Sequence, residues 1–290
     1  MREVSVAPQG FVRLVDTMPT AIAESTNLDS AIVQAARIST GQGTKDPIAD
    51  RSLIRYLMRN KHTSPFEMVE FKFHLKMPIF VARQWMRHRM ASINEYSGRY
   101  AEIPDDCWIP GPYDIRMQSA VNKQSSDPVT EYSENAGEFV NQFNNVYEKA
   151  YKAYAKAVNK GIAREQARTI LPQAMYTEFY WKIDLHNLLN FVRLRADRHA
   201  QLEIQEYANA VYSLVQPLVP VACEAFQDYV VNAVTFSKAE INAIRDAIKS
   251  CNLDDKLKVD TSKFGKTEIL EFDAKLNKLG LKATKGQSDQ

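Results

Sequence analysis

Two stretches of the chain alternate strictly between apolar and polar side chains. In Val69–Lys76 the odd positions are apolar and the even positions are Glu, Lys or His, and Tyr176–Asp184 alternates in a similar way. A period of two places one face of a strand in the core and the other in water, so both stretches are predicted as strands. Phe11–Thr17 is a third strand candidate, and residues 1–10 before it are expected to form a loose arm.

Other segments repeat their apolar side chains at helical spacing. In Leu185–Arg195 the apolar positions fall at i, i+3, i+4 and i+7, which predicts an amphipathic helix. Further helices are expected at Asp29–Ile38, from Pro47 to about Asn60, at Ile79–Arg89, from Glu131 to about Lys160, and through most of Gln201–Val234. Pro47 suits a first helical turn and Gly161 a helix end. The many helices and few strands predict a fold that mixes α and β structure.

The composition changes after Phe236. Ser237 is suited to cap a short helix at Lys238–Lys249, and residues 250–290 are rich in Lys and Asp. We therefore expect one folded domain over residues 1–236. A polar C-terminal appendage over residues 237–290 would follow it, partly helical and with a disordered end.

Composition limits the class of protein. The 290 residues include 13 Phe, 13 Tyr and 3 Trp, which is enough apolar surface to exclude disorder over the whole chain. Lys and Arg total 37 and Asp and Glu 35, so the net charge of +2 gives no general attraction to nucleic acid or membrane. The 3 cysteines are too scattered for a disulfide framework, and neither a signal peptide nor a long apolar run is visible. A cytoplasmic protein without a membrane span is expected.

The densest set of polar side chains begins with Arg87-His88-Arg89 and ends near Arg99. Guanidinium groups bind phosphate oxygens through paired hydrogen bonds, and Gly98 permits a close backbone approach. The alternative is a solvated helix end with surface ion pairs.

The helical spacing of this first set suggests more than one anion. If residues 79–89 form one helix, Gln84, Arg87 and His88 share a face and Arg89 points away from it. Cations on two faces suit two anionic groups.

A second set lies between Asp184 and Gln201. His186, Asn190 and Arg193 stack on one side of the predicted helix, and Arg195 falls on the opposite side. Arg195 is either a cation that faces a ligand or an arginine at the edge of the core paired with an acid.

A third polar set, His62–Glu67, contains Ser64 three residues before Glu67, which predicts a capping box.

Several other kinds of site are not supported. The chain has no GxGxxG or Walker A motif, and its histidines lack metal-binding spacing, so no metal site is expected. Ser97 lacks a GxSxG turn, and Cys107 has no basic neighbour in sequence to activate it.

The polar sets resemble the flavin-dependent thymidylate synthases. The signature is Arg87-His88-Arg89, then seven residues, then Ser97. Further blocks resemble the family in the same order over about residues 11–234: Ala35–Ser39, His62–Glu67, Pro78–Trp85, Asn94–Tyr100, Ala167-Arg168 with Leu171-Pro172, and Leu194–Asp197 with His199–Gln201.

The resemblance implies an activity and an assembly. Members methylate dUMP to dTMP, with methylenetetrahydrofolate as the carbon donor, FAD as the hydride carrier and NADPH as the reductant of the flavin. It implies the family's own α/β fold, with long helices and a small, mostly antiparallel sheet. It also implies a cytoplasmic homotetramer that binds FAD and dUMP where subunits meet, with neither nucleic acid nor membrane as a partner.

The resemblance also assigns residues by matching position. FAD would be held by Ser39, Ser64, Arg87, His88, Arg89, Asn94, Glu95, Asp184, His186 and Asn190. The substrate dUMP would be held by Gln84, Trp85, Met86, Arg87, Glu95, Tyr96, Ser97, Gly98, Arg99, Arg168 and Arg195. Arg195 would be the catalytic residue that activates the uracil ring.

The chain departs from the usual family pattern at two places. Met68 replaces a common His, and Asp184-Leu185-His186 replaces a common Asn-Ala-Arg. His186 still donates hydrogen bonds, so flavin binding should survive, whereas a carboxylate at Asp184 would contact backbone or ribose rather than phosphate.

The rival hypothesis is a nucleic-acid-binding module that uses the arginines, but a pI of about 8.3 is lower than such domains usually have.

Overall fold

The computed structural model describes residues 2–20, 27–39, 41, 46–111, 114–120, 126–128, 134–250, 261, 264–279 and 281. The chain divides into two compact units. Unit 1 comprises Met1–Thr44 and His62–Glu224, and unit 2 comprises Lys45–Lys61 and Ala225–Gln290. The sequence-based boundary after residue 236 stays a prediction.

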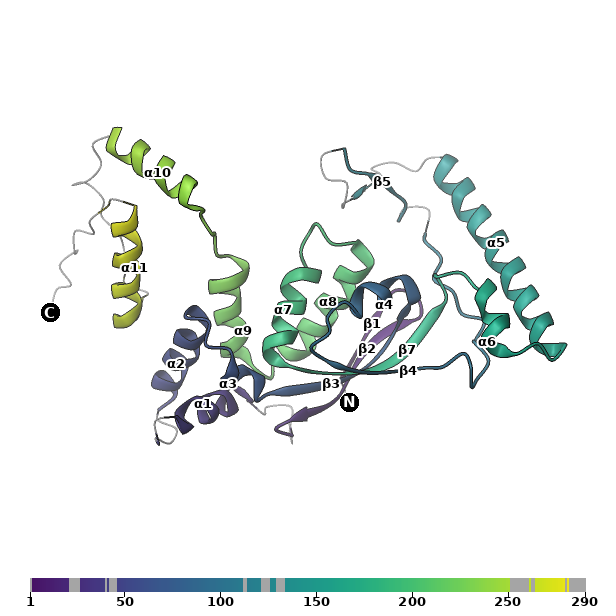
Figure 1. Cartoon of the computed structure of the whole chain (residues 1–290), viewed down its shortest axis with the longest axis horizontal. Coiled ribbons are helices and arrows are strands. Elements are labelled where there is room, and N and C mark those ends of the chain that lie inside the picture. The colour runs from purple at the N-terminus through teal and green to yellow at the C-terminus, as the bar shows by residue number, and fades with distance from the viewer. Residues whose placement is uncertain are drawn as a thin grey trace. The chain divides into compact units, whose positions relative to one another are not determined.

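Unit 1 is built on a five-stranded antiparallel sheet with the strand order β1-β2-β3-β7-β4 (Figure 1). The strands are β1 (Arg2–Val6), β2 (Gly10–Met18), β3 (Glu70–Pro78), β4 (Ser92–Glu95) and β7 (Tyr176–Asp184). The three predicted strands are confirmed, two of them from their alternation. The side chains of Val69, Phe71, Phe73 and Leu75 are fully buried, as the period of two requires.

The expected loose arm at residues 1–10 is wrong. Arg2–Val6 forms an edge strand that pairs with β2, from Arg2 opposite Leu14 to Val6 opposite Gly10. Ala7 takes a positive φ of 57° in the connecting turn, a conformation that is uncommon for alanine and that the sequence does not predict.

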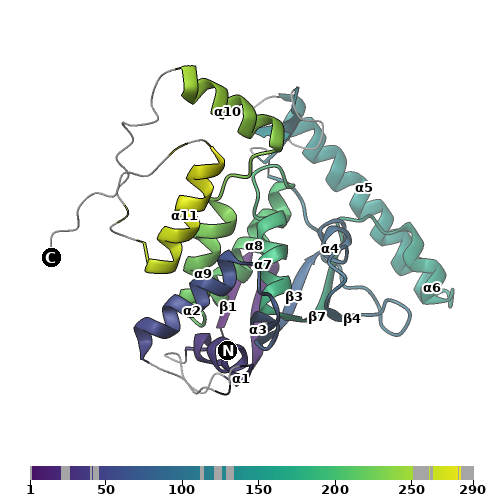
Figure 2. The same cartoon turned by 60° about the vertical axis from the view of Figure 1, so that its left-hand side comes forward.

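Unit 1 also contains several helices. They are α1 (Asp29–Ile38), α3 (Ser64–Glu67), α4 (Ile79–Trp85), α5 (Glu134–Asn159), α6 (Arg164–Ala167), the 3₁₀ turn η1 (Arg168–Ile170), α7 (Leu185–Arg195) and α8 (Leu202–Val215). Helices α4, α7 and α8 lie along one face of the sheet (Figures 1 and 2). A short hairpin of β5 (Arg116–Gln118) and β6 (Ser126–Pro128) precedes α5. No helix in the described part of the chain is both long and apolar enough to cross a membrane.

An aromatic cluster joins α4, β7 and α7. The ring of Trp85 lies 5.0 Å from that of Trp181 and 4.2 Å from that of Phe191, measured between centroids, and all three side chains are fully buried. Aromatic contacts at these distances add to the stabilisation that burial gives. The cluster therefore fixes the end of α4 relative to α7, and both ends carry residues of the predicted site.

Two local predictions near the site are wrong. Helix α4 ends at Trp85, and His88 follows in a turn in which its N–H donates to Trp85 O at 3.0 Å. The helical-face argument for residues 79–89 therefore does not apply. Thr63, not Ser64, occupies the N-cap of α3 and makes no side-chain capping bond, so no capping box forms there.

Helix ends in unit 1 follow the expected chemistry elsewhere. Asp184 caps α7 by accepting a hydrogen bond from the N–H of Asn187 at 2.9 Å. Gly161 follows α5 with a φ of +80°, which a residue with a side chain rarely adopts.

Unit 2 contains α2 (Pro47–Arg59), the end of α9 (Pro220–Phe226), the π-helical turn η2 (Gln227–Val231), α10 (Lys238–Ser250) and α11 (Lys266–Lys278). Arg59 of α2 forms an ion pair with Glu271 of α11, and Tyr229 donates to Glu268 at 2.7 Å. Ser237 caps α10 as predicted, because its Oγ accepts from the N–H of Glu240 at 3.3 Å. The end of the 237–290 appendage, which is expected to be disordered, lies outside the described residues.

Candidate functional site

The ends of α4 and α7 bring together residues from two sequence blocks. Arg195 Nε donates to His88 Nε2 at 3.0 Å, and Arg195 Nη2 donates to the carbonyl oxygen of Gln84 at 3.4 Å. The amide of Gln84 in turn donates to Gln201 Oε1 at 2.5 Å. Two predicted dUMP contacts, Gln84 and Arg195, thus lie together with a predicted flavin contact, His88.

His88 is a neutral hydrogen-bond acceptor in this cluster. Burial and then the charge of Arg195 lower its pKa from 6.5 to about 4. Because Arg195 Nε–H is a donor, Nε2 of His88 accepts and Nδ1 carries the proton. The imidazole ring also packs against the ring of Phe191 in a T-shaped arrangement, with 4.9 Å between the centroids. His88 is therefore held from two sides.

Arg195 keeps an uncompensated charge. The guanidinium is half-buried, and burial lowers its pKa from the ordinary value, although an arginine stays protonated in proteins. Within the described residues its polar partners are a neutral imidazole and a carbonyl oxygen, and no carboxylate pairs with it. The sequence left two alternatives open for Arg195. Within the described residues the second one, an ion pair with an acid, is not found.

A second cluster begins at the last residue of β4 and continues into the segment after it. Glu95 Oε1 accepts a hydrogen bond from Thr177 Oγ1 at 2.7 Å, and the N–H of Tyr96 donates to the carbonyl oxygen of Glu178 at 2.8 Å. Ser97 Oγ accepts from the N–H of Arg99 at 3.3 Å. Strand β7 therefore fixes the start of this predicted dUMP segment, and Ser97 closes a local turn.

Gly98 allows the same segment to approach Arg168. A Cβ added at Gly98 would lie 2.9 Å from Ile103 Cδ1 and 3.3 Å from Arg168 Cδ, which is too close for ordinary packing. The phenol oxygen of Tyr154 in α5 accepts a hydrogen bond from the N–H of Ile103 at 2.8 Å. The structure thus brings the predicted residues Gly98 and Arg168 together and anchors them to α5.

Other predicted side chains are exposed and available. Ser39, Ser64, Arg87, Arg89, Asn94 and Arg168 are all exposed. Arg99 pairs with Glu165 at 3.3 Å, but both side chains are more than half exposed, so water screens the pair. Met86 is half-buried, as is His186 on the first turn of α7.

Three predicted contacts already interact with other parts of the protein. Trp85 is fully buried in the aromatic cluster, so a contact with a nucleotide would have to come from its backbone. The Asp184 carboxylate caps α7 and also accepts from Asn187 Nδ2 at 2.7 Å. Asn190 Oδ1 accepts from Arg193 Nη2 at 3.0 Å.

Sequence reasoning missed the residues that position the site. Thr177, which orients Glu95, is one of many buried residues in a strand, and Gln201, which holds Gln84, lies in a matched block without an assigned role. Phe191 supports His88, but only its helical spacing is visible in the sequence. Each of these contacts joins residues that are far apart in the sequence, so the spacing of residues along the chain does not predict them.

The described cysteines do not offer a reactive thiolate. Burial, followed by the charges of Asp106 and Asp105, raises the pKa of the Cys107 thiol to about 12. Burial likewise raises the pKa of the Cys223 thiol to about 12. Both thiols are protonated at neutral pH, so neither is activated as a nucleophile.

The fold and the two clusters define an α/β protein with unneutralised cations suited to an anionic ligand. The family of the thymidylate synthase complementing protein matches residues 20–221, more than half of the chain. A flavin-dependent thymidylate synthase of Dictyostelium discoideum is 51% identical over 243 residues, which cover 84% of this chain and 80% of that protein. The corresponding protein of Treponema denticola is 47% identical over 247 residues, 85% and 90% of the two chains.

The chain therefore belongs to the flavin-dependent thymidylate synthases, a family of methyltransferase enzymes. A crystal structure of a UMP/dUMP methylase from Streptomyces cacaoi, bound with 5-Br dUMP, matches this fold with a TM-score of 0.68 at 32% identity. The match covers 78% of this chain and 98% of that one. These findings confirm the resemblance and the predicted fold class.

Proposed function

We propose that this protein converts dUMP to dTMP, with methylenetetrahydrofolate as the carbon donor and NADPH as the reductant of a bound FAD. Family membership supports a flavin and the methylation of dUMP. The solved relative from Streptomyces cacaoi is described as a UMP/dUMP methylase and holds a brominated dUMP, which supports a pyrimidine nucleotide as substrate. The carbon donor and the reductant follow from the resemblance of the sequence.

The observation that carries the proposal is the environment of Arg195. A half-buried guanidinium whose described partners are neutral retains its full charge for an incoming group. Methylation at C5 requires an electron-rich uracil, and a cation beside N3 and O2 would stabilise the negative charge that develops on the ring. Fixed charge aimed at developing charge is an effective form of catalysis.

Other residues of the site would orient Arg195 and bind dUMP. Arg195 would be held in place by His88 and by the carbonyl oxygen of Gln84. Arg168 and Arg99 would bind the phosphate of dUMP, with Ser97 as a hydrogen-bond partner of the nucleotide. Arg168 is exposed, and its side chain packs against Gly98, where a larger residue would collide with it.

The described residues fit an FAD molecule. Arg87 and Arg89 are exposed and have no ion-pair partner among the described residues, so they match the charge of a diphosphate. Asn94, Ser39 and Ser64 are exposed hydrogen-bonding side chains, and His186 and Asn190 lie on the same helix as Arg195. The flavin, when bound, supplies the hydride, and the protein supplies position and charge.

We also propose a homotetramer. Four large apolar side chains around the site segment, Met90, Ile93, Tyr96 and Tyr100, are exposed, and Tyr100 is 80% exposed. Exposed apolar side chains concentrated in one segment are suited to contact with a second copy of the chain. A monomeric mass by light scattering at micromolar concentration, measured with FAD bound, would contradict the tetramer.

The direct test is the visible spectrum of the purified protein. A bound flavin makes the protein yellow, and NADPH should bleach it; dUMP and methylenetetrahydrofolate added afterwards should yield dTMP and restore the colour. A colourless protein that copurifies with ultraviolet-absorbing nucleic acid would instead favour the nucleic-acid-binding alternative. A yellow protein that forms no dTMP would contradict the proposed reaction but not the flavin.

A further inference from the structure

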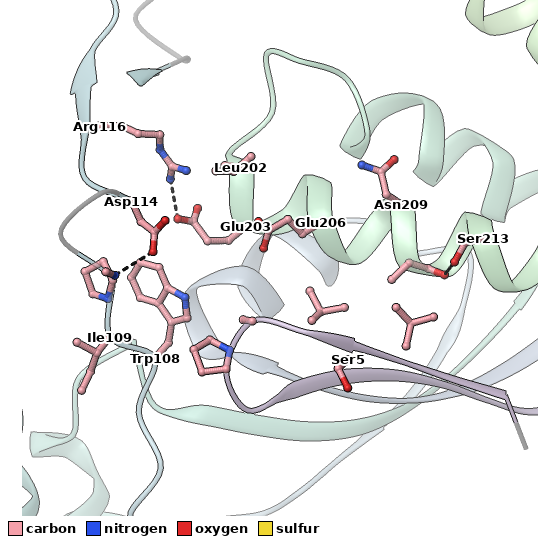
Figure 3. Close-up of a pocket in the computed structure, with 17 residues that line it drawn as sticks. Ser5, Trp108, Ile109, Asp114, Arg116, Leu202, Glu203, Glu206, Asn209 and Ser213 are labelled. Atoms are coloured by element: carbon pink, nitrogen blue, oxygen red, sulfur yellow. Dashed lines mark hydrogen bonds and ion pairs between the residues drawn. The ribbon is translucent and has the colours of Figure 1, made fainter. Parts of the chain in front are cut away.

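Unit 1 contains a cavity of about 790 Å³ that none of the predicted site residues lines (Figure 3). Strand β1 and the turn after it form one wall, α8 forms the second, and Trp108–Gly111 together with Asp114 and Arg116 form the third. Val4, Val6, Ile109 and Ala210 give the cavity apolar surface. The volume lies within the range of pockets that bind small organic molecules.

Three carboxylates and one guanidinium line the same cavity. They are Asp114, Glu203, Glu206 and Arg116. Arg116 Nη2 donates to Glu203 Oε1 at 2.6 Å, and Asp114 Oδ2 accepts from the N–H of Gly111 at 2.9 Å. Figure 3 shows Asp114, Glu203 and Arg116 turned toward one another beside Trp108. With one cation against three acids, the lining has an excess of negative charge.

Glu203 is buried with part of its hydrogen-bonding capacity unused. The residue is 6% exposed, and within the described residues no donor reaches its Oε2 atom. Arg116 Nη1 likewise has no acceptor in the described part of the chain. Buried polar atoms without a partner are rare in folded proteins and call for a ligand or a water molecule. A small rotation about the soft terminal torsion of Glu203 would present Oε2 to a donor in the cavity.

The acids also disfavour one another. The pKa of Glu206 is raised by burial and then by the charges of Glu203 and Asp114, while Arg116 lowers it. A bound cation would reduce the electrostatic repulsion between these carboxylates. No group of three or more His, Cys, Asp or Glu among the described residues is arranged to hold a metal ion, so an organic cation fits better.

We propose that this cavity is a second ligand site, which binds a small organic cation by its charged nitrogen at Glu203 and Glu206 and by its apolar body at Trp108. A protonated amine or amidinium supplies the donor that Glu203 Oε2 lacks, and the face of an indole attracts cations. Val4 and Val6 enclose the apolar part of the ligand. The site uses none of the residues proposed for the flavin or for dUMP.

Benzamidine is a suitable probe, with the neutral benzamide as its isosteric control. Calorimetric titration of the full-length protein should show benzamidine binding about tenfold or more tightly than benzamide, because a hydrogen bond between charged groups is worth more than a neutral one. Equal affinity for the two compounds would overturn the proposal, as would the absence of benzamidine binding.

Two variants make the test specific. Glu203→Gln keeps an acceptor for Arg116 but removes the charge, so it should weaken benzamidine by about tenfold or more. Ser213→Ala changes another residue of the lining and should alter the affinity by no more than about twofold. If Glu203→Gln binds benzamidine as the wild type does, the carboxylate is not the binding group. If it instead lowers the oligomeric mass, the cavity holds a basic side chain of a second copy, and the small-molecule proposal fails.

Discussion

Replacing Arg195 with alanine removes the cation that we expect to activate the uracil ring. The side chain is fixed by hydrogen bonds of 3.0 Å to His88 and 3.4 Å to the carbonyl oxygen of Gln84, so its charge is already in place before the substrate binds. Losing one preorganised charge of this kind costs on the order of 3 kcal/mol in the transition state. That corresponds to a rate about a hundredfold lower.

The loss should fall on the chemical step rather than on binding. A neutral uracil gains less from a cation than a ring on which charge is developing, so kcat should fall more than dUMP affinity. Arg195→Ala should remain yellow and accept electrons from NADPH. The measurement is single-turnover formation of dTMP from the pre-reduced protein at saturating dUMP.

Two further variants separate charge from geometry. Arg195→Lys restores the charge, but one ammonium lacks the planar fork that bonds His88 and Gln84 together, so it should recover only part of the rate. Arg198→Ala removes an exposed arginine just beyond α7 and should keep the wild-type rate. If Arg195→Ala itself turns over at the wild-type rate, Arg195 has a structural role and another group activates the ring.

Three other predictions follow from the same contacts. Ser97→Ala should weaken dUMP binding in equilibrium titrations yet leave measurable turnover; complete loss of turnover with normal binding would make Ser97 catalytic. Deletion after Cys251 should leave FAD absorbance intact but lower the free energy of unfolding by about 1–3 kcal/mol in urea, because Arg59 loses Glu271; a colourless product would place the tail in the flavin site. Because the pKa of His88 is lowered from 6.5 to about 4 in the folded state, the unfolded state binds more protons in that window. The free energy of unfolding should therefore fall as the pH is lowered through it, and fall less in His88→Gln; identical pH dependence would contradict a neutral, buried His88.

The sequence predicts those parts of the fold that depend on local periodicity. Val69–Lys76 and Tyr176–Asp184 are recognised as strands because one buried face imposes a period of two, and both lie in the sheet as expected. Strand β1 is not recognised from its period because it is a short edge strand with little burial. Its pairing with β2 defines it as a strand.

Elements that depend on distant contacts could not be predicted in the same way. Helix α4 ends at Trp85 although Arg87–Arg89 have no residue that breaks a helix; the turn instead brings His88 to Arg195, 107 residues further along the chain. The residue types of the site were visible in the sequence, whereas the neutral state of His88 was not. It arises from burial and from a neighbouring charge that only the folded chain supplies.

The position of β4 at the edge of the sheet has a consequence for how this protein tolerates change. All four residues of β4 are exposed, and among the described strands it pairs with β7 alone, where Glu95 lies opposite Phe179. Successive side chains of a strand point to opposite faces, so a shift of one residue would turn Glu95 away from Thr177 and bring Asn94 to its place. Single substitutions in such an exposed segment should have little effect on folding, whereas inserting or deleting one residue before Ser97 should exchange the two faces of the segment. For the fold of this region, the length of the chain is constrained more tightly than its composition.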